Sequence, residues 1–337
     1  MKRITSVLIA ATIGLVAPIQ NAQAAAEFNL RFAHFWPPQA GMSQQFQAWG
    51  DAVEKDSNGR IKVEMYPSQT LAKAPKIYDA VVSSIADVGA TVQGYTANRF
   101  PLSQVIELPG IAESGALGSC VFQTLLDQGD IADEYSETHP LFVFTHGPGM
   151  IHTKGTAVKT PEDLKGLRIR RPTAVVADLL TGLGSQPVGM PAPQIYQSMS
   201  RGVIDGATLP WEGVKSFRLN ELADNHTDIN LYTLAFVVTM NKGTYESMPA
   251  DLRQVIDKNS GLAWAVKTGQ LMDEQDKVGL AQAKELGHTI TTIEGGVENP
   301  AWKGVLEQAT ENYLSQNGAT ARSIYEKIPA LSKNCRN

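Results

Sequence analysis

Two arginines in the stretch 167–172 (LRIRRP) have the type and spacing needed to bind an anion. Because the side chains of a strand alternate between its two faces, Arg168 and Arg170 share one face and Ile169 takes the other. The planar guanidinium of arginine donates two parallel hydrogen bonds to a single carboxylate. The pattern predicts either an anion site at the end of a strand or a solvated basic edge, and taken alone it favours the basic edge.

Two aromatic segments follow predicted strands and are candidates for the wall of a binding site. Trp211 comes directly after Pro210 and a short strand, where a tryptophan lines a cleft or anchors a core equally well. Phe35 and Trp36 follow the first predicted strand, where an aromatic pair lines a site or fills a hinge. Both interpretations stay open for both segments.

Patterns of common catalytic sites are missing from the chain. It has neither a G-x-S-x-G nucleophile motif nor a G-x-x-x-x-G-K-[ST] phosphate-binding loop. The spacing of His146 and His152 does not place both on one helical face, as a zinc site of the H-E-x-x-H type requires. We therefore expect no enzymatic activity, no metal and no cofactor.

Composition and charge exclude several classes of protein. The 337 residues include 29 Lys plus Arg and 34 Asp plus Glu, which gives a net charge of −5. Binding of nucleic acid needs a basic surface, so we expect no nucleic-acid partner. With 43% hydrophobic and 19% charged residues the chain is globular, and its length corresponds to about two domains.

The first 24 residues have the order of a secretory signal peptide. Lys2 and Arg3 precede a short apolar run, and small residues end the segment at Ala24. We expect cleavage near Ala24 and export to the periplasm, with a retained N-terminal anchor as the alternative. An oxidising compartment permits a disulfide between Cys120 and Cys335, and two buried thiols are the alternative.

Short strands and helices alternate along the mature chain, which predicts an α/β fold. One series of strands and helices starts at Phe28, and a second starts near His146. The apolar segment 231–240 predicts one buried strand, and 250–286 predicts one long helix or two in line. We expect two lobes, 25–147 with 236–270 and 148–235 with 271–337, braced by this helix. The cleft between them is the expected ligand site.

Several segments, in the same order along the chain, resemble the solute-binding proteins of TRAP (tripartite ATP-independent periplasmic) transporters, of the dicarboxylate-binding-protein family. They are 66–71 (YPSQTL), 160–173 (TPEDLKGLRIRRPT), 183–191 (LGSQPVGMP) and 202–206 (GVIDG). The resemblance covers the mature chain. It implies the periplasmic-binding-protein fold, in which two α/β lobes close on a small organic acid. It also implies a monomer that delivers the acid to the membrane subunits of a TRAP transporter.

The resemblance also implies which residues bind the ligand. The family's carboxylate-binding arginine falls on Arg170, which reverses the preference for a basic edge. We expect the side chains of Trp211, Phe35 and Trp36 to pack against the apolar part of the ligand. The remaining predicted ligand positions are Thr173, Lys73, Thr91, Gln93 and Met150.

Departures from the family's pattern predict the kind of acid. Gly149 or Met150 stands where some members have a second arginine, and Leu209 stands where some have asparagine. A less polar, more aromatic pocket predicts an aryl or keto acid rather than a sugar acid. Lys73 keeps a C4-type dicarboxylate as an alternative, because it could pair with a second carboxylate. A ligand-sensing partner of a membrane receptor is the alternative role.

Overall fold

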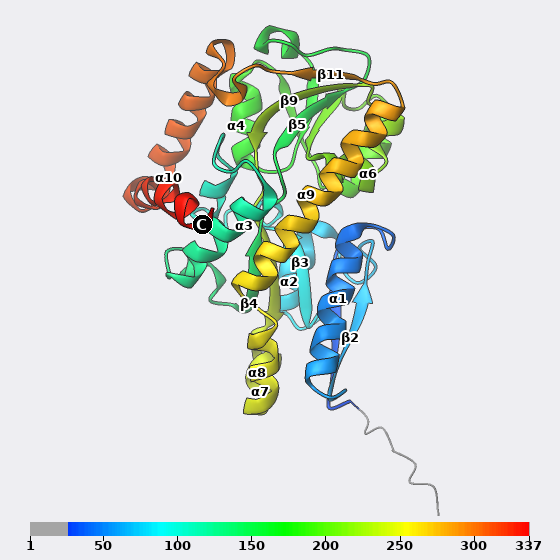
Figure 1. Ribbon diagram of the computed structural model, residues 1–337, viewed down its shortest axis with the longest axis vertical. Coiled ribbons are helices and arrows are strands. Elements are labelled where there is room, and N and C mark those ends of the chain that lie inside the picture. The colour runs from blue at the N-terminus through cyan, green and yellow to red at the C-terminus, as the bar shows by residue number, and fades with distance from the viewer. Residues whose placement is uncertain (1–25, 337) are drawn as a thin grey trace, which may run out of the picture.

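Two mixed sheets form the centre of the computed structural model, which describes residues 26–336 (Figure 1). The predicted signal peptide, 1–24, lies outside the described residues. The first sheet, in the order β2-β1-β3-β10-β4, consists of β1 (Phe28–Ala33), β2 (Ile61–Tyr66), β3 (Val88–Val92), β4 (Thr138–Phe144) and β10 (Phe236–Asn241). The second, in the order β11-β9-β5-β8-β6-β7, consists of β5 (Gly149–Thr153), β6 (Arg168–Arg171), β7 (Gln186–Gly189), β8 (Gly206–Leu209), β9 (Asn225–Tyr232) and β11 (Thr289–Thr292).

The chain crosses between the two sheets at residues 145–148 and again at 233–235. The strand that follows each crossing, β5 or β10, runs antiparallel to both of its neighbours. Our prediction of a single strand over 231–240 is therefore wrong. The segment is apolar because the end of β9 and all of β10 are buried, each in a different sheet.

Helices pack around both sheets, as Figure 1 shows. They are α1 (Gly41–Asp56), α2 (Ile77–Val82), α3 (Gly115–Asp127), α4 (Ala174–Gly182), α5 (Ile195–Ser200), α6 (Trp211–Ser216), α7 (Lys242–Ser247), α8 (Ala250–Lys258), α9 (Leu262–Glu285) and α10 (Pro300–Cys335). The α10 helix is broken at Gly318, whose φ is 76°. Among residues 26–336, no helix combines the length and the apolarity that a membrane crossing requires.

Each sheet, together with the helices that pack beside it, is one half of the molecule. The α9 helix runs along both halves (Figure 1). Of the two alternatives predicted for 250–286, one long helix or two, the structure has two, α8 and α9, and Gly261 with a φ of 71° immediately precedes α9. On α9, a Cβ at Gly269 would come within 2.2 Å of the Gly115 carbonyl oxygen, and one at Gly279 equally close to that of Trp211. Glycine at these two positions lets α9 pack directly on the starts of α3 and α6.

Two carboxylates of α9 bind the first amides of these same helices. Asp273 accepts hydrogen bonds from the Gly115 and Ala116 amides at 2.6 and 3.0 Å. Asp276 accepts one from the Glu212 amide at 2.6 Å. Burial raises the pKa of both aspartates. Since α3 packs beside the first sheet and α6 beside the second, α9 joins the two halves.

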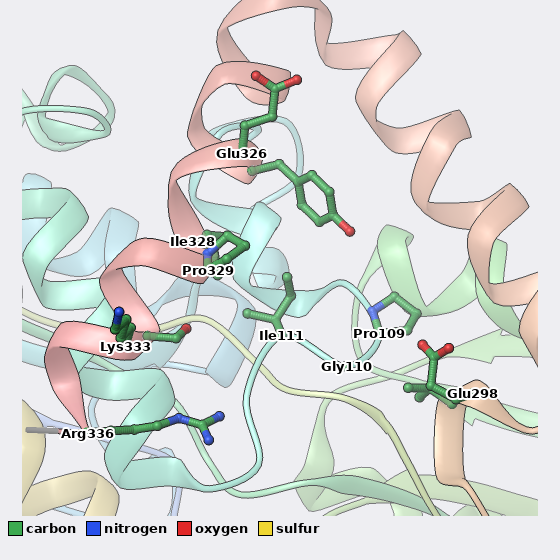
Figure 2. Close-up of a pocket in the computed structure, with 12 residues that line it drawn as sticks. Pro109, Gly110, Ile111, Glu298, Glu326, Ile328, Pro329, Lys333 and Arg336 are labelled. Carbon is green, nitrogen blue, oxygen red and sulfur yellow. The ribbon is translucent and has the colours of Figure 1, made fainter.

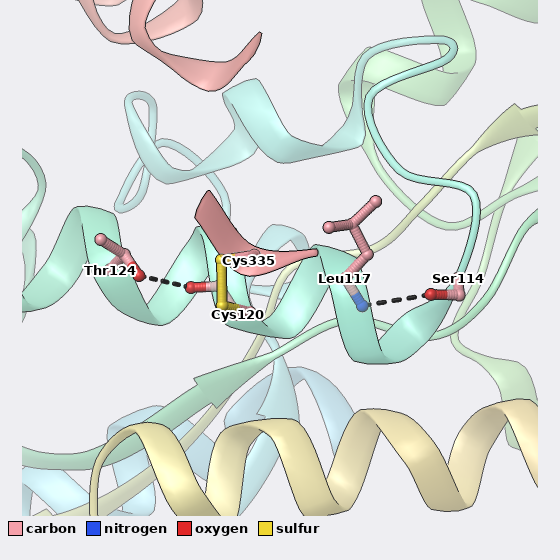
Figure 3. Close-up of a disulfide and its surroundings, with 5 residues drawn as sticks. All are labelled: Ser114, Leu117, Cys120, Thr124 and Cys335. Carbon is pink, nitrogen blue, oxygen red and sulfur yellow. Dashed lines mark hydrogen bonds between the residues drawn. A yellow bond between two sulfur atoms is a disulfide. The ribbon is translucent and has the colours of Figure 1, made fainter. Parts of the chain in front are cut away.

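A disulfide ties the last turn of α10 to α3 (Figure 3). Cys120 and Cys335 are 215 residues apart in sequence, and their Cα atoms are 6.0 Å apart. Nearby, the Ser114 side chain caps α3 by accepting from the Leu117 amide at 3.1 Å, and the Thr124 hydroxyl donates to the Cys120 carbonyl at 2.7 Å. The chain terminus is thus fixed to a helix of the first half.

Candidate functional site

A small cavity lies where strand ends of both sheets meet. Its volume of about 30 Å³ is room for one or two water molecules, so an organic acid enters only when the cavity widens. From the first half it is lined by Phe35, Trp36, Val92 and Tyr95, and from the crossing segments and β10 by His146, Leu234 and Phe236. From the second half it is lined by Arg170, Ala192, Leu209, Pro210, Glu212, Gly213 and Phe217.

Arg170 is completely buried and carries a charge that no acidic side chain of residues 26–336 pairs with. Its Nε donates to the Met190 carbonyl and its Nη1 to the Thr208 carbonyl, both at 2.9 Å. Its Nη2 donates to the Tyr95 hydroxyl at 3.1 Å. A guanidinium has five N–H donors, so two remain. Because an unpaired buried charge is strongly unfavourable, this geometry is suited to an anion with two acceptor oxygens.

Flat aromatic side chains make up much of the cavity wall. Phe35 stacks on Trp36 with 3.9 Å between ring centroids, and it lies nearly parallel to Phe217 at 6.3 Å. The Trp36 ring lies 5.7 Å from that of Phe236. Such a wall suits a flat apolar body attached to the anionic group.

Three further polar side chains line the cavity. The Tyr95 hydroxyl accepts from Arg170 and also from the Ala192 amide at 2.9 Å, so it connects the two halves. Burial raises the pKa of the Glu212 carboxyl to about 7. Burial lowers the pKa of the His146 imidazole to about 4, and the nearby charge of Arg170 also contributes.

The structure brings three of the residues that the sequence singled out, Arg170, Phe35 and Trp36, together around the cavity. Six others lie outside its lining, namely Trp211, Thr173, Thr91, Gln93, Lys73 and Met150. Trp211 packs against His152 and His226, with centroids 5.2 and 4.7 Å away. Its neighbours Pro210 and Glu212 line the cavity instead.

Two predicted residues lie in and just after β3. The alternation of the strand turns Thr91 away from the cavity that Val92 lines, whereas Gln93 starts the short 3-10 turn that follows the strand. The Thr91 hydroxyl donates to the Ala74 carbonyl at 3.3 Å, and the Gln93 amide donates to the Tyr135 hydroxyl at 2.5 Å. Both polar groups therefore have their hydrogen-bond partners inside the first half.

The remaining three residues have structural environments of other kinds. Thr173 caps α4 and donates its hydroxyl hydrogen to the buried Glu107 at 2.6 Å, a contact between the two halves. Lys73 is exposed to solvent. Met150 is part of the core, opposite Leu209 in the register of β5 and β8.

Sequence reasoning missed Tyr95, His146, Glu212 and Phe217. Glu212 directly follows the predicted Trp211, and Tyr95 lies two residues after the predicted Gln93. The signal that could have found Glu212 is its position as a polar residue at the start of a short helix. For Tyr95 it is the position of a polar residue in a turn after a strand. His146 was considered only as a metal ligand.

A larger groove of about 850 Å³ lies on the outside of the molecule, along the second part of α10 (Figure 2). It runs between the loop at Pro109 and the last turns of α10, where Lys333 and Arg336 lie. Its lining holds no buried charge, since the charged side chains around it reach solvent. The groove therefore lacks the feature that makes the inner cavity an anion site.

Two sheets are joined by two crossings and a bracing helix, and between them lies a buried arginine that no acidic side chain in the described part of the chain pairs with. Together these features define a two-lobed receptor for a small anion. Residues 32–317 match the model of the DctP family, described as bacterial extracellular solute-binding protein, family 7. The chain belongs to this family. This confirms the predicted family and the two-lobed α/β fold, and members of the family are periplasmic solute-binding subunits of TRAP transporters.

Three relatives illustrate the similarity. A TRAP solute-binding protein from an unidentified marine microbe, specific for aromatic acid ligands and crystallised with 3-hydroxybenzoate, is 36% identical with a TM-score of 0.88, over 93% of this chain and 100% of that one. A TRAP solute-binding protein of Rhodoferax ferrireducens with copurified benzoate is 37% identical with a TM-score of 0.86, over 91% and 98%. The C4-dicarboxylate-binding periplasmic protein DctP of Rhodobacter capsulatus is 24% identical over 94% and 96%.

Proposed function

We propose that the protein captures an aromatic monocarboxylate in the periplasm and delivers it to the membrane subunits of a TRAP transporter. The observation that carries the proposal is the buried Arg170, which lines a cavity with aromatic walls and has two N–H donors without a partner among residues 26–336. The aromatic acids bound by the two similar solved structures support it. The C4-dicarboxylate alternative has less support, because Lys73 is exposed and lies outside the cavity lining.

The proposal includes the finer features that the sequence predicts. The signal peptide is cleaved near Ala24, and the mature protein acts as a monomer in which 25–147 with 236–270 and 148–235 with 271–337 form the two lobes. The protein binds its ligand without chemical turnover. Mass spectrometry of the ligand recovered after binding should therefore find it unchanged.

A thermal-shift screen tests the proposed ligand class. Benzoate, mandelate, pyruvate, succinate and glucuronate are compared at equal concentration, with calorimetry for those that act. A ligand present at 100 times its Kd stabilises the folded protein by about 2.7 kcal/mol, so a true ligand raises Tm measurably. We expect the aromatic acids to raise Tm most. A rise with succinate and none with any aromatic acid would contradict the proposal.

Uptake measurements separate transport from sensing. Deletion of the gene for this protein should abolish uptake of the aromatic acid at low concentration. Deletion of the TRAP membrane subunits should do the same. Normal uptake in both strains would favour the role of a ligand-sensing partner of a membrane receptor.

A further inference from the structure

Glu212 places a carboxyl group on the wall of the cavity that also contains Arg170. Its side chain is buried, and its Oε1 accepts a hydrogen bond from the Ser216 hydroxyl at 2.6 Å. Within residues 26–336 it forms no ion pair with lysine or arginine. The ammonium of the neighbouring Lys215 donates instead to the Gln275 side chain at 2.7 Å. The charge of an ionised Glu212 thus has no direct cationic partner in the described part of the chain.

His146 adds a second acceptor to the lining of the same cavity. Its Nδ1 lies in hydrogen-bond contact with the Gly147 carbonyl oxygen, which can only accept, so Nδ1 carries the hydrogen. Burial lowers the pKa of this imidazole to about 4, so it is neutral near pH 7. Its Nε2 therefore presents a lone pair, and this buried atom has no hydrogen-bond partner among the described residues.

The polar groups of the cavity are thus divided by type. Arg170 offers only donors, whereas ionised Glu212 and the Nε2 of neutral His146 offer only acceptors. A complementary ligand has a carboxylate for the first and an O–H or N–H donor for the second. A ligand that lacks this donor leaves the buried Nε2 of His146 unpaired and gives Glu212 no hydrogen-bond donor beyond Ser216 and Trp36, which is unfavourable.

We propose that Glu212 and His146 determine specificity, selecting an aromatic monocarboxylate that carries a hydrogen-bond donor on its ring and rejecting aromatic dicarboxylates. The inference rests on the proposed function, in which Arg170 binds the ligand's carboxylate. A second carboxylate would face the carboxylate of Glu212 in a site of low dielectric, where like charges repel strongly.

Calorimetry with three probes that differ at one ring position tests this inference. Benzoate has no substituent, 3-hydroxybenzoate has a donor, and isophthalate has a second carboxylate. At pH 8, Glu212 is mainly ionised, since burial raises its pKa to about 7. We expect 3-hydroxybenzoate to bind about 10-fold tighter than benzoate, and isophthalate about 100-fold weaker than 3-hydroxybenzoate.

Variants then assign the selection to Glu212. In Glu212→Gln the advantage of the hydroxyl group should fall below about threefold, and isophthalate should gain about 10-fold relative to 3-hydroxybenzoate. Glu246→Gln, on the exposed surface of α7, is the matched control and should leave all three affinities unchanged. The ligand 3-methoxybenzoate supplies a test without any variant. It offers no donor, so it should bind no tighter than benzoate.

The outcomes separate this inference from the function on which it rests. Equal binding of benzoate, 3-hydroxybenzoate and 3-methoxybenzoate by the native protein overturns the inference and leaves the proposed function standing. Unchanged ratios in Glu212→Gln overturn the role of Glu212. Failure of every aromatic acid to bind overturns the proposed function itself.

Discussion

Replacement of Arg170 by lysine tests whether the guanidinium holds the ligand's carboxylate. Three of its five donors bind Met190, Thr208 and Tyr95, which leaves two for the ligand. A hydrogen bond to a charged group contributes about 1.5–3 kcal/mol, so two contribute about 3–6 kcal/mol. This corresponds to a factor of about 10²–10⁴ in Kd. Lysine retains the charge but has only three donors on one nitrogen, and it cannot reproduce this geometry.

The assay is calorimetric titration of benzoate into Arg170→Lys, with Arg168→Lys as the matched control. Arg168 lies on the same strand, but its Nη2 pairs with Asp205 Oδ1 at 2.6 Å, and its side chain is 41% exposed. We expect Arg170→Lys to bind at least about 100-fold more weakly. The control should remain within about twofold of the native Kd, because exposed ion pairs contribute little.

One result would refute this reasoning. If Arg170→Lys keeps a native Kd and a native Tm, the guanidinium does not hold the carboxylate. Loss of binding in both variants would point to a general disturbance of this strand rather than to a specific role of the Arg170 guanidinium. A thermal melt of each variant without ligand shows whether the fold is retained.

Three further predictions concern closure and stability. Tyr95→Phe should weaken benzoate binding about 10-fold in calorimetry, because the Arg170 and Ala192 donors lose their shared acceptor. Replacing both cysteines by serine should lower the free energy of unfolding by about 2–5 kcal/mol in urea melts and leave Kd unchanged, since the disulfide lies outside the cavity lining. Burial raises the pKa of Glu107 to about 8, so the stability that its neutral form provides below pH 4.5 is lost as pH rises through 8. Between pH 6 and pH 8, the free energy of unfolding measured in urea melts should therefore fall by about 2–3 kcal/mol more in the native protein than in Glu107→Gln. This follows from about 1.36 kcal/mol for each pH unit.

The fold was predictable from the sequence to the extent that local patterns determine it. Alternating apolar residues marked β1 and β2 correctly, and helical spacing marked α1. The strand predicted over 231–240 failed because a pattern of apolar residues reports burial and not which sheet buries them. The crossing at 233–235 contains no glycine or proline that would mark a break.

The site was predictable only in part, because neighbouring residues point in different directions. Trp211 and Glu212 are adjacent, yet the first packs on the histidines of β5 and β9 while the second lines the cavity. Which of the two reaches the site depends on how α6 starts, and α9 influences that start through Asp276. A contact 64 residues away in sequence is invisible to local reasoning.

The burial of Arg170 links ligand binding to the joining of the two halves. Arg170 belongs to β6 of the second sheet, and the Tyr95 hydroxyl that accepts a hydrogen bond from its guanidinium comes from the first half. Covering the charge excludes water from it, which is unfavourable while no anion is present. A bound carboxylate removes that penalty, so it stabilises the closed arrangement more than an arrangement in which Arg170 is hydrated. A protein with a net charge of −5 therefore binds an anion without contradiction, because the local field of one enclosed guanidinium decides the binding.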